Sequence, residues 1–120
     1  MTAARCAKLI YFSAAPGRER EYEDYLRSTV EPIDRRAREQ GALVDMMTFI
    51  NDGNRRDGPA GWTHLRVFLF EDAAQRARVK DVFAKVAAEI EPDEGRRARR
   101  KAEGEAMRTL LAEIDTGILD

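Results

Sequence analysis

His64 and Arg66 are the residues whose types and spacing are best suited to acid–base chemistry. His64 is the only histidine in the chain, and an imidazole exchanges protons readily near neutral pH. Arg66 follows two residues later, so both side chains project from the same face of an extended strand. A guanidinium beside an imidazole can stabilise an oxyanion, an enolate or a carboxylate. We therefore expect His64 to act as the acid–base and Arg66 to stabilise developing negative charge.

Asp45 is the third candidate catalytic residue. It lies in the preceding strand-like segment, and a hairpin that closes around Arg55 and Arg56 would place it nearly opposite Arg66. In the functional interpretation, its carboxylate orients His64 or Arg66. In the alternative, Asp45 and Arg66 form a cross-strand ion pair, and His64 is a hydrogen-bonded interface residue. The sequence leaves both interpretations open.

Several aromatic and thioether side chains are candidates for a substrate-binding pocket. Small-molecule pockets are mostly apolar and contain a few polar groups that fix the orientation of the ligand. The candidate substrate-binding residues are Trp62, Tyr11, Phe49, Phe68 and Met47. For Phe68 and for Phe70 the favoured alternative is the core of a dimer. The phenol of Tyr11 could hold a substrate oxygen, or it could cap an edge of the sheet.

Composition excludes several classes of function. The 120 residues suit a single domain, 1–120, with a net charge of −1, so there is no overall basic excess for nucleic acid. The basic run at residues 96–101 is flanked by acidic residues at helical spacing, which is typical of a solvated helix face. One cysteine and one histidine do not make a usual zinc site. We expect neither a metal nor another cofactor.

The chain has no pattern typical of a membrane or secreted protein. Its apolar runs fall well short of the roughly 20 residues of a membrane span. The N-terminal apolar segment ends at Pro16 and Gly17, which indicate a turn and do not resemble a signal peptide. We therefore expect a cytoplasmic protein with no membrane partner.

Hydrophobic periodicity predicts the elements that position these residues. Apolar residues spaced three and four apart predict helices, and alternation predicts strands. Pro32 should kink or break the first helix near Val30 and Glu31. The expected order is a strand (7–14), a helix (18–40), two strands (42–50 and 61–70), a helix from 72 to about 91, a third helical segment (93–114), and a short edge strand or loose tail (115–120).

This order predicts an α+β, ferredoxin-like fold, βαββα(β), with an antiparallel sheet and helices on one face. We expect the helices to cover an aliphatic face with Thr63, Leu65, Val67, Leu69, Val44, Met46, Thr48 and Ile50. The other face would then carry Trp62, His64, Arg66, Phe68, Phe70, Leu43, Asp45, Met47 and Phe49. So large an apolar face indicates an interface, and pairing with a second copy would bury it.

Four segments resemble the dimeric α+β-barrel superfamily, of the antibiotic-biosynthesis monooxygenase or stress-responsive type. They are GREREYEDYL (17–26), VEP (30–32), QGAL (40–43) and the strand-to-helix passage at 62–74, and the resemblance covers roughly residues 7–90. It implies a homodimer whose sheets pack face to face, with a pocket in each protomer. Many members have a histidine early in the second helix, where this chain has Arg76, Arg78 and Lys80.

The resemblance implies three classes of function. The first is a metal-free enzyme of monooxygenase, cyclase or isomerase type that acts on a small, largely apolar, aromatic or polyketide-like substrate. The second is a non-catalytic dimeric protein that binds a ligand or is related to stress. The third is a haem-binding protein in which His64 would ligate the iron. An open cavity that reaches His64 would favour the enzyme over a purely structural module.

Overall fold

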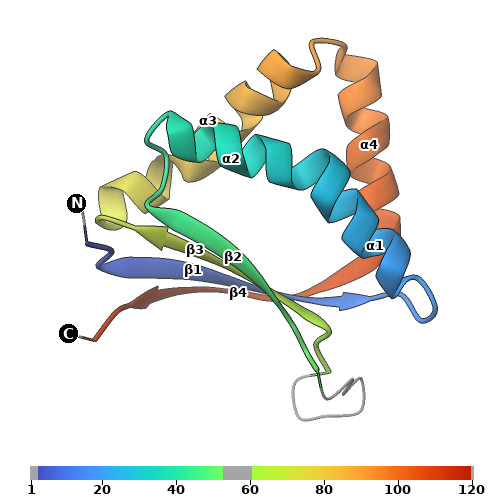
Figure 1. Cartoon of the computed structure of the whole chain (residues 1–120). Coiled ribbons are helices and arrows are strands. Elements are labelled where there is room, and N and C mark those ends of the chain that lie inside the picture. The colour runs from blue at the N-terminus through green and yellow to red at the C-terminus, as the bar shows by residue number, and fades with distance from the viewer. Residues whose placement is uncertain (1–2, 53–60, 120) are drawn as a thin grey trace.

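The computed structural model describes residues 3–52 and 61–119. The strands form one curved sheet, and the helices lie above it (Figure 1). The elements are β1 (Cys6–Ala14), α1 (Glu19–Tyr25), the π-helical turn η1 (Leu26–Val30), α2 (Glu31–Glu39), β2 (Asp45–Ile50), β3 (His64–Phe70), α3 (Ala73–Ile90), α4 (Glu94–Ala106) and β4 (Arg108–Gly117).

The sheet has the strand order β2-β3-β1-β4, and each neighbouring pair is antiparallel. All the helices lie on one face of the sheet, and the opposite face is bare (Figure 1). This arrangement confirms the predicted α+β, ferredoxin-like class, with β1 and β3 side by side. None of the described helices is long and apolar enough to cross a membrane.

The predicted orientation of β3 is wrong. His64, Arg66 and Phe68 are buried beneath the helices, whereas Leu65 and Val67 lie half-buried on the bare face. The aliphatic side of the strand had been expected to form the core. Instead the aromatic rings pack under the helices, and the helices supply carboxylates for the two polar side chains. A buried charge is tolerated when it is paired, so this orientation satisfies both the rings and the polar groups.

The register of β2 against β3 removes Asp45 from the expected catalytic group. Asp45 pairs with Leu69, and Thr48 is the residue that pairs with Arg66. Because directly paired residues share a face, Asp45 lies on the bare side, away from Arg66. Its carboxylate accepts a hydrogen bond from Arg38 at 3.0 Å. The expectation that Thr48 faces the helices is confirmed, and the expected hairpin closure at residues 55–56 lies outside the described residues.

The first helical region continues through the predicted break at Pro32. The π-helical turn η1 ends at Val30, and Pro32 is the second residue of α2, within the first turn, where a missing backbone N–H is tolerated. A π-helical turn inserts one wider turn into a helix without ending it. The irregularity therefore lies where the sequence predicts it, near Val30 and Glu31, but it is a π-helical turn and not a break in the helix.

The C-terminal region differs most from the prediction. Residues 93–114 had been expected to be one helix, but α4 ends at Ala106 and β4 runs from Arg108 to Gly117. Met107, Leu110, Leu111 and Ile114 have helical spacing, yet pairing with β1 makes this segment a strand. The β1–β4 register shifts between Tyr11 and Phe12, which accommodates one extra residue in β4.

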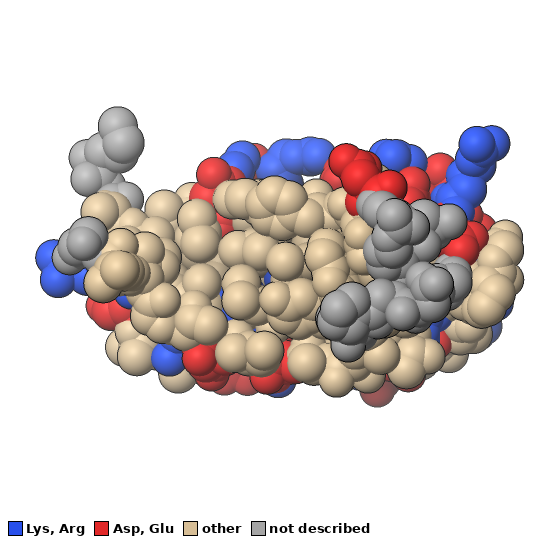
Figure 2. All heavy atoms as spheres, turned by 90° about the horizontal axis from the view of Figure 1, so that it is seen from below, with Lys and Arg blue, Asp and Glu red and all other residues tan. Residues whose placement is uncertain are grey.

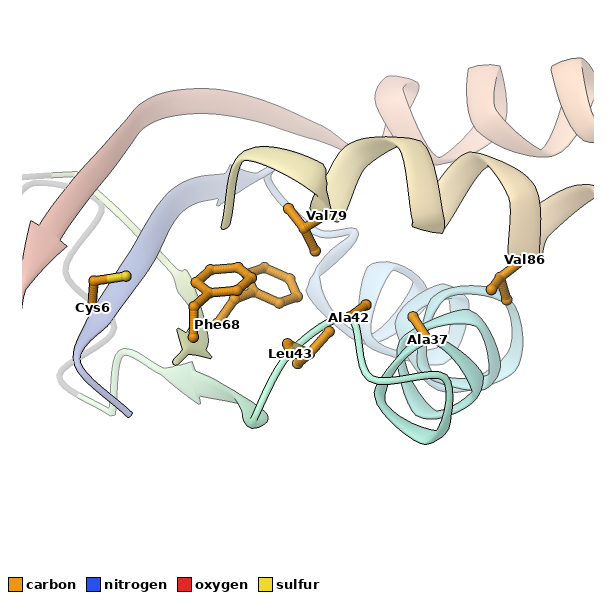
Figure 3. Packing of buried hydrophobic residues seen from close by; sticks show 8 residues of the cluster. Cys6, Ala37, Ala42, Leu43, Phe68, Val79 and Val86 are labelled. Carbon is orange, nitrogen blue, oxygen red and sulfur yellow. The ribbon is translucent and has the colours of Figure 1, made fainter. Parts of the chain in front are cut away.

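The main core lies between the sheet, α2 and α3 (Figure 3). Figure 3 shows Phe68 directed from β3 toward Leu43 and Ala42, with Val79 and Val86 entering from α3. A second, smaller cluster of Ala14, Tyr22, Leu26 and Met107 lies beneath α1. The candidate polar residues of β3 therefore lie at the border between two apolar clusters.

Candidate functional site

The candidate site is a buried imidazole–carboxylate pair between β3 and α1. His64 Nε2 lies 2.8 Å from Glu23 Oε2. The imidazole is 1% exposed, and the Glu23 side chain is 24% exposed. Glu23 is therefore the member of the pair that solvent or a small molecule can reach, and His64 lies behind it.

Two further groups fix the orientation of the imidazole. Thr63 Oγ1 lies 2.8 Å from His64 Nδ1 and also accepts a 2.8 Å hydrogen bond from the backbone N–H of Ala14. The ring of Tyr22 meets the imidazole edge-on, with centroids 5.1 Å apart. Both ring nitrogens and one edge of the imidazole are thus held in place, as a preorganised site requires.

For a neutral imidazole, the hydrogen-bond distances favour one tautomer. The Thr63 hydroxyl is 2.8 Å from His64 Nδ1 but 3.4 Å from the carbonyl oxygen of Phe12. The shorter contact favours donation of the hydroxyl proton to Nδ1. His64 Nε2–H then donates to the Glu23 carboxylate. In this arrangement His64 has no free lone pair, so Glu23 is the proton acceptor that faces outward.

A cavity of about 130 Å³ opens beside this pair. Its walls come from α1, η1, α2, β2 and β3, so the site is assembled from segments far apart in the sequence. Thr48 and Ile50 form the sheet side of the cavity. The full set of lining residues is Glu23, Leu26, Arg27, Glu31, Thr48, Ile50 and His64. Two carboxylates, a hydroxyl, an imidazole and a guanidinium therefore surround a partly aliphatic space.

Arg66 lies on the same face as His64, as predicted, but it is already paired. Its Nη2 donates to the buried carboxylate of Asp34 on α2, and its Nε donates to Thr48 Oγ1 at 3.3 Å. Its guanidinium also lies 4.9 Å above the Phe68 ring. Burial raises the pKa of the Asp34 carboxyl, and the Arg66 charge offsets part of that rise. Arg66 thus positions Thr48 at the cavity wall.

The five residues expected to bind substrate do not form one pocket. Phe68 packs against Phe83 in the core, with ring centroids 5.6 Å apart. Met47 and Phe49 lie on the bare face of the sheet. Tyr11 also belongs to the bare face and meets the Trp62 ring edge-on at 5.8 Å. None of them lines the cavity beside His64.

Sequence reasoning missed Glu23, Asp34 and Thr63. Glu23 had been assigned to the acidic start of a helix, where it is one carboxylate among several. Asp34 carried a clearer signal, because it lies beside Ile33 on the helix face that Ala37 helps to bury. An acidic residue at the border of an apolar helix face indicates a buried partner. Thr63 carried no such signal.

Comparison with known proteins establishes the fold. No protein-family model and no curated protein matches the chain. The structure is similar to HapK from Hahella chejuensis (TM-score 0.62, 9% identity, 95% of this chain and 92% of that one). It is also similar to a dimeric ferredoxin-like protein from an uncultured marine organism (TM-score 0.64, 10% identity, 100% of this chain and 90% of that one). A third similar structure is an EthD family protein from Bacillus halodurans (TM-score 0.59, 16% identity, 95% of this chain and 99% of that one).

Proposed function

We propose that the protein is a small-molecule enzyme that uses Glu23 for proton transfer and His64 to hold the Glu23 carboxylate in position. The observation that carries this proposal is the carboxylate–imidazole pair at the wall of an open cavity. Two titratable side chains that contact each other at the wall of a cavity, one of them buried, are typical of acid–base sites. The acid–base role expected of His64 thereby passes to Glu23, which would contact the substrate, and His64 becomes a positioning residue.

In the proposed mechanism, Glu23 takes a proton from an acidic carbon or hydroxyl of the substrate. The His64 Nε2–H bond holds the carboxylate in position, and Thr63 holds the imidazole from behind. The Thr48 hydroxyl can donate to the substrate oxygen on which charge develops. Glu23 then returns the proton at another position, which completes an isomerisation or a cyclisation without net proton loss. With dioxygen as a co-substrate, the carbon of the same enolate-like species would form a C–O bond to give a hydroperoxide. Loss of water from this hydroperoxide breaks the O–O bond and leaves one oxygen atom as a new carbonyl, so the substrate carbon itself supplies the electrons.

The substrate we propose is small and largely apolar, of aromatic or polyketide-like type. Leu26 and Ile50 supply the apolar walls of the cavity. The volume of about 130 Å³ is below the range of roughly 300–1,000 Å³ typical of ligand pockets, so a bound substrate would extend past the cavity mouth. The polar groups at the mouth, Arg27 and Glu31, would meet that extension.

A ligand screen by thermal shift tests this proposal. The compounds are planar phenols and polyketide-like ketones, and the variants are Glu23→Gln and Glu21→Gln. Glu21 is exposed on the same helix and pairs with Arg18, so it controls for loss of helix charge. We expect at least one compound class to raise the Tm of the wild type and of Glu21→Gln, but not of Glu23→Gln. Equal shifts in all three proteins would exclude Glu23 from the site.

The single histidine allows a second test, independent of any ligand. The ¹⁵N spectrum of the imidazole contains the signals of His64 alone, so its tautomer can be read directly. We expect a protonated Nε2 at neutral pH, and a changed Nε2 signal in Glu23→Gln. A protonated Nδ1 with a free Nε2 would contradict the proposed hydrogen-bond network and return the role of base to His64.

The small cavity favours a second candidate function, a non-catalytic ligand-binding or stress-related protein. In that case a compound would stabilise the wild type and be recovered unchanged after prolonged incubation. A haem-binding role gains no support, because both ring nitrogens of His64 are hydrogen-bonded and the cavity is small. The absence of a Soret shift on adding haem is the expected result.

We propose that the protein forms a homodimer through the bare face of its sheet. Figure 2 shows this face as a broad surface of uncharged residues with charged residues at its rim. It includes the side chains of Leu9, Met47, Phe49, Val67 and Ile114, several of which are exposed. Apolar patches of this kind mark interfaces, and one of the similar structures is a dimeric ferredoxin-like protein.

Light scattering after gel filtration tests the dimer. Phe49→Asp places a charge among the exposed apolar side chains of the bare face, on the edge strand β2, and Ala84→Asp places the same charge on the exposed surface of α3. We expect the wild type and Ala84→Asp to elute as dimers and Phe49→Asp to elute as a monomer. A monomeric wild type, or a dimeric Phe49→Asp variant, would show that this face is not the interface.

A further inference from the structure

A second cavity, of about 300 Å³, lies where the N-terminal half of α3 crosses β1 and β4. Its lining residues are Lys8, Ala73, Arg76, Ala77, Lys80 and Asp115. It is separate from the Glu23–His64 site, because Lys8 pairs with Phe68 while His64 pairs with Phe12, four residues further along β1. That separation corresponds to roughly 13 Å along a strand.

Three cationic side chains converge on this cavity. The Lys8 side chain is only 11% exposed, although it carries an ammonium group on the central strand β1. Arg76 is anchored by two backbone carbonyl oxygens, those of Ala7 at 3.2 Å and Thr116 at 3.1 Å, which hold the guanidinium without neutralising it. Lys80 follows one helical turn later at the outer edge. An anchored guanidinium beside a buried ammonium is a fixed region of positive charge.

The carboxylate of Asp115 shows which chemical group this charge accommodates. Asp115 Oδ1 accepts a 2.9 Å hydrogen bond from Lys8 Nζ, and its Oδ2 lies 3.7 Å from Arg76 Nε. These cations hold the pKa of the Asp115 carboxyl below its usual range, chiefly through the Lys8 hydrogen bond. The Asp115 side chain is nevertheless half exposed. It therefore lies at the mouth of the cavity and can turn out into solvent.

The acidic residues nearby do not balance the positive charge. Glu113 lies 3.3 Å from Lys80 and 3.7 Å from Lys8. Together with Asp115 it provides two carboxylates for the three cations Lys8, Arg76 and Lys80. Both carboxylates belong to the edge strand β4. The cavity thus retains one net positive charge and one wall formed by Ala73 and Ala77.

We propose that this cavity binds the carboxylate group of a small organic acid. The carboxylate would take the position of the Asp115 carboxylate between Lys8 and Arg76, and Asp115 would turn outward. The apolar part of the acid would lie against Ala73 and Ala77. The volume of about 300 Å³ is at the lower end of the range of ligand pockets, which suits a molecule of a few to about ten heavy atoms.

An NMR titration with sodium benzoate at low ionic strength tests this site. The proteins are the wild type, Lys8→Met, Asp115→Asn and Lys85→Met. We expect benzoate to shift amide signals of β1 and α3 around the cavity in the wild type. Lys8→Met should weaken binding at least about tenfold, because one close charge partner is lost. Asp115→Asn should strengthen binding severalfold, because it removes the competing carboxylate.

The controls separate this site from general electrostatic attraction. Lys85 is exposed on α3 and does not line the cavity, so Lys85→Met should change the affinity less than twofold. Benzamide has the same ring without the charge and should not bind. The Glu23→Gln variant should bind benzoate like the wild type, since that site is separate.

Three results would overturn the proposal. Equal binding by Lys8→Met and the wild type would exclude Lys8 as the charge partner. Weaker binding by Asp115→Asn than by the wild type would show that Asp115 does not compete with the ligand. The Asp115→Asn titration tests the proposal even if Lys8→Met fails to fold. Tighter binding of inorganic phosphate than of benzoate would show that the cavity prefers phosphate to carboxylate.

Discussion

The contact between Tyr25 and Gly104 joins α4 to α1, and it gives a sharp test of the packing. A Cβ atom added at Gly104 would lie 2.3 Å from Tyr25 Cζ and 2.5 Å from the phenolic oxygen. Such distances are impossible without movement of the ring or of α4. Overpacking of this kind costs roughly 1–3 kcal/mol, while alanine in a helix interior gains up to about 1 kcal/mol over glycine. We expect Gly104→Ala to destabilise the protein by about 1 kcal/mol net.

A double-mutant cycle in urea isolates the steric part of this effect. The proteins are the wild type, Gly104→Ala, Tyr25→Ala and the double variant. Without the ring, Gly104→Ala should stabilise the protein by up to about 1 kcal/mol, since only helix propensity remains. The coupling free energy between the two positions should therefore be about 2 kcal/mol. In thermal unfolding, 1 kcal/mol corresponds to roughly 4 °C in Tm for a chain of this size.

Gly95→Ala provides the matched control in the same helix. A Cβ there would lie 3.3 Å from Asp93 Oδ1 and 3.6 Å from Arg99 Nη1, so side chains can adjust to it. We expect a change within about 0.5 kcal/mol of the wild type. If Gly104→Ala were as stable as Gly95→Ala, or if Tyr25→Ala did not reverse its effect, the docking of α4 on α1 would be wrong.

Three further predictions concern charges and one turn. Asp34→Ala should cost about 3–5 kcal/mol in urea, because it leaves Arg66 buried without its partner, whereas Asp34→Leu combined with Arg66→Met should cost far less. A lowered pKa means that Asp115 stabilises the folded state above its unfolded pKa and loses this effect as pH falls through its folded pKa. Asp115→Asn should therefore lower Tm at pH 7, and this difference should disappear as the pH falls through the folded pKa of Asp115. Gly41→Ala should cost roughly 1–2 kcal/mol in urea, because Gly41 has φ 81°.

Most helices and strands of the fold could be predicted from the local spacing of apolar residues. The spacing of Tyr22, Leu26 and Ala37 predicted the first helical region, and alternation predicted β3. Which face of β3 meets the helices was not readable, because both faces are apolar enough to serve as core. The strand β4 was missed for a related reason. Its apolar residues fit a helical period, and only pairing with β1, about 100 residues away, makes it a strand.

The candidate site was predictable in part. His64 and Arg66 could be selected because a polar pair on an otherwise apolar strand needs an explanation. Their true partners come from the covering helices, 41 and 32 residues away in the chain. Local periodicity carries no information about which helix side chain crosses to which strand position. Asp45 was chosen from an assumed pairing with Arg66, but it pairs with Leu69, three residues further along β3, and Arg66 lies on the opposite face of the sheet.

The position of β1 has a consequence for the order in which the protein folds during synthesis. Among the described strands β1 is made before the others, yet one of its neighbours, β4, is made after them, and Lys8 and Asp115 are 107 residues apart. Until β4 leaves the ribosome, one edge of β1 has unpaired backbone groups, and exposed edges of this kind pair readily with other chains. The nascent chain should therefore depend on chaperones until its last strand is complete, and loss of β4 should favour aggregation over a smaller folded product.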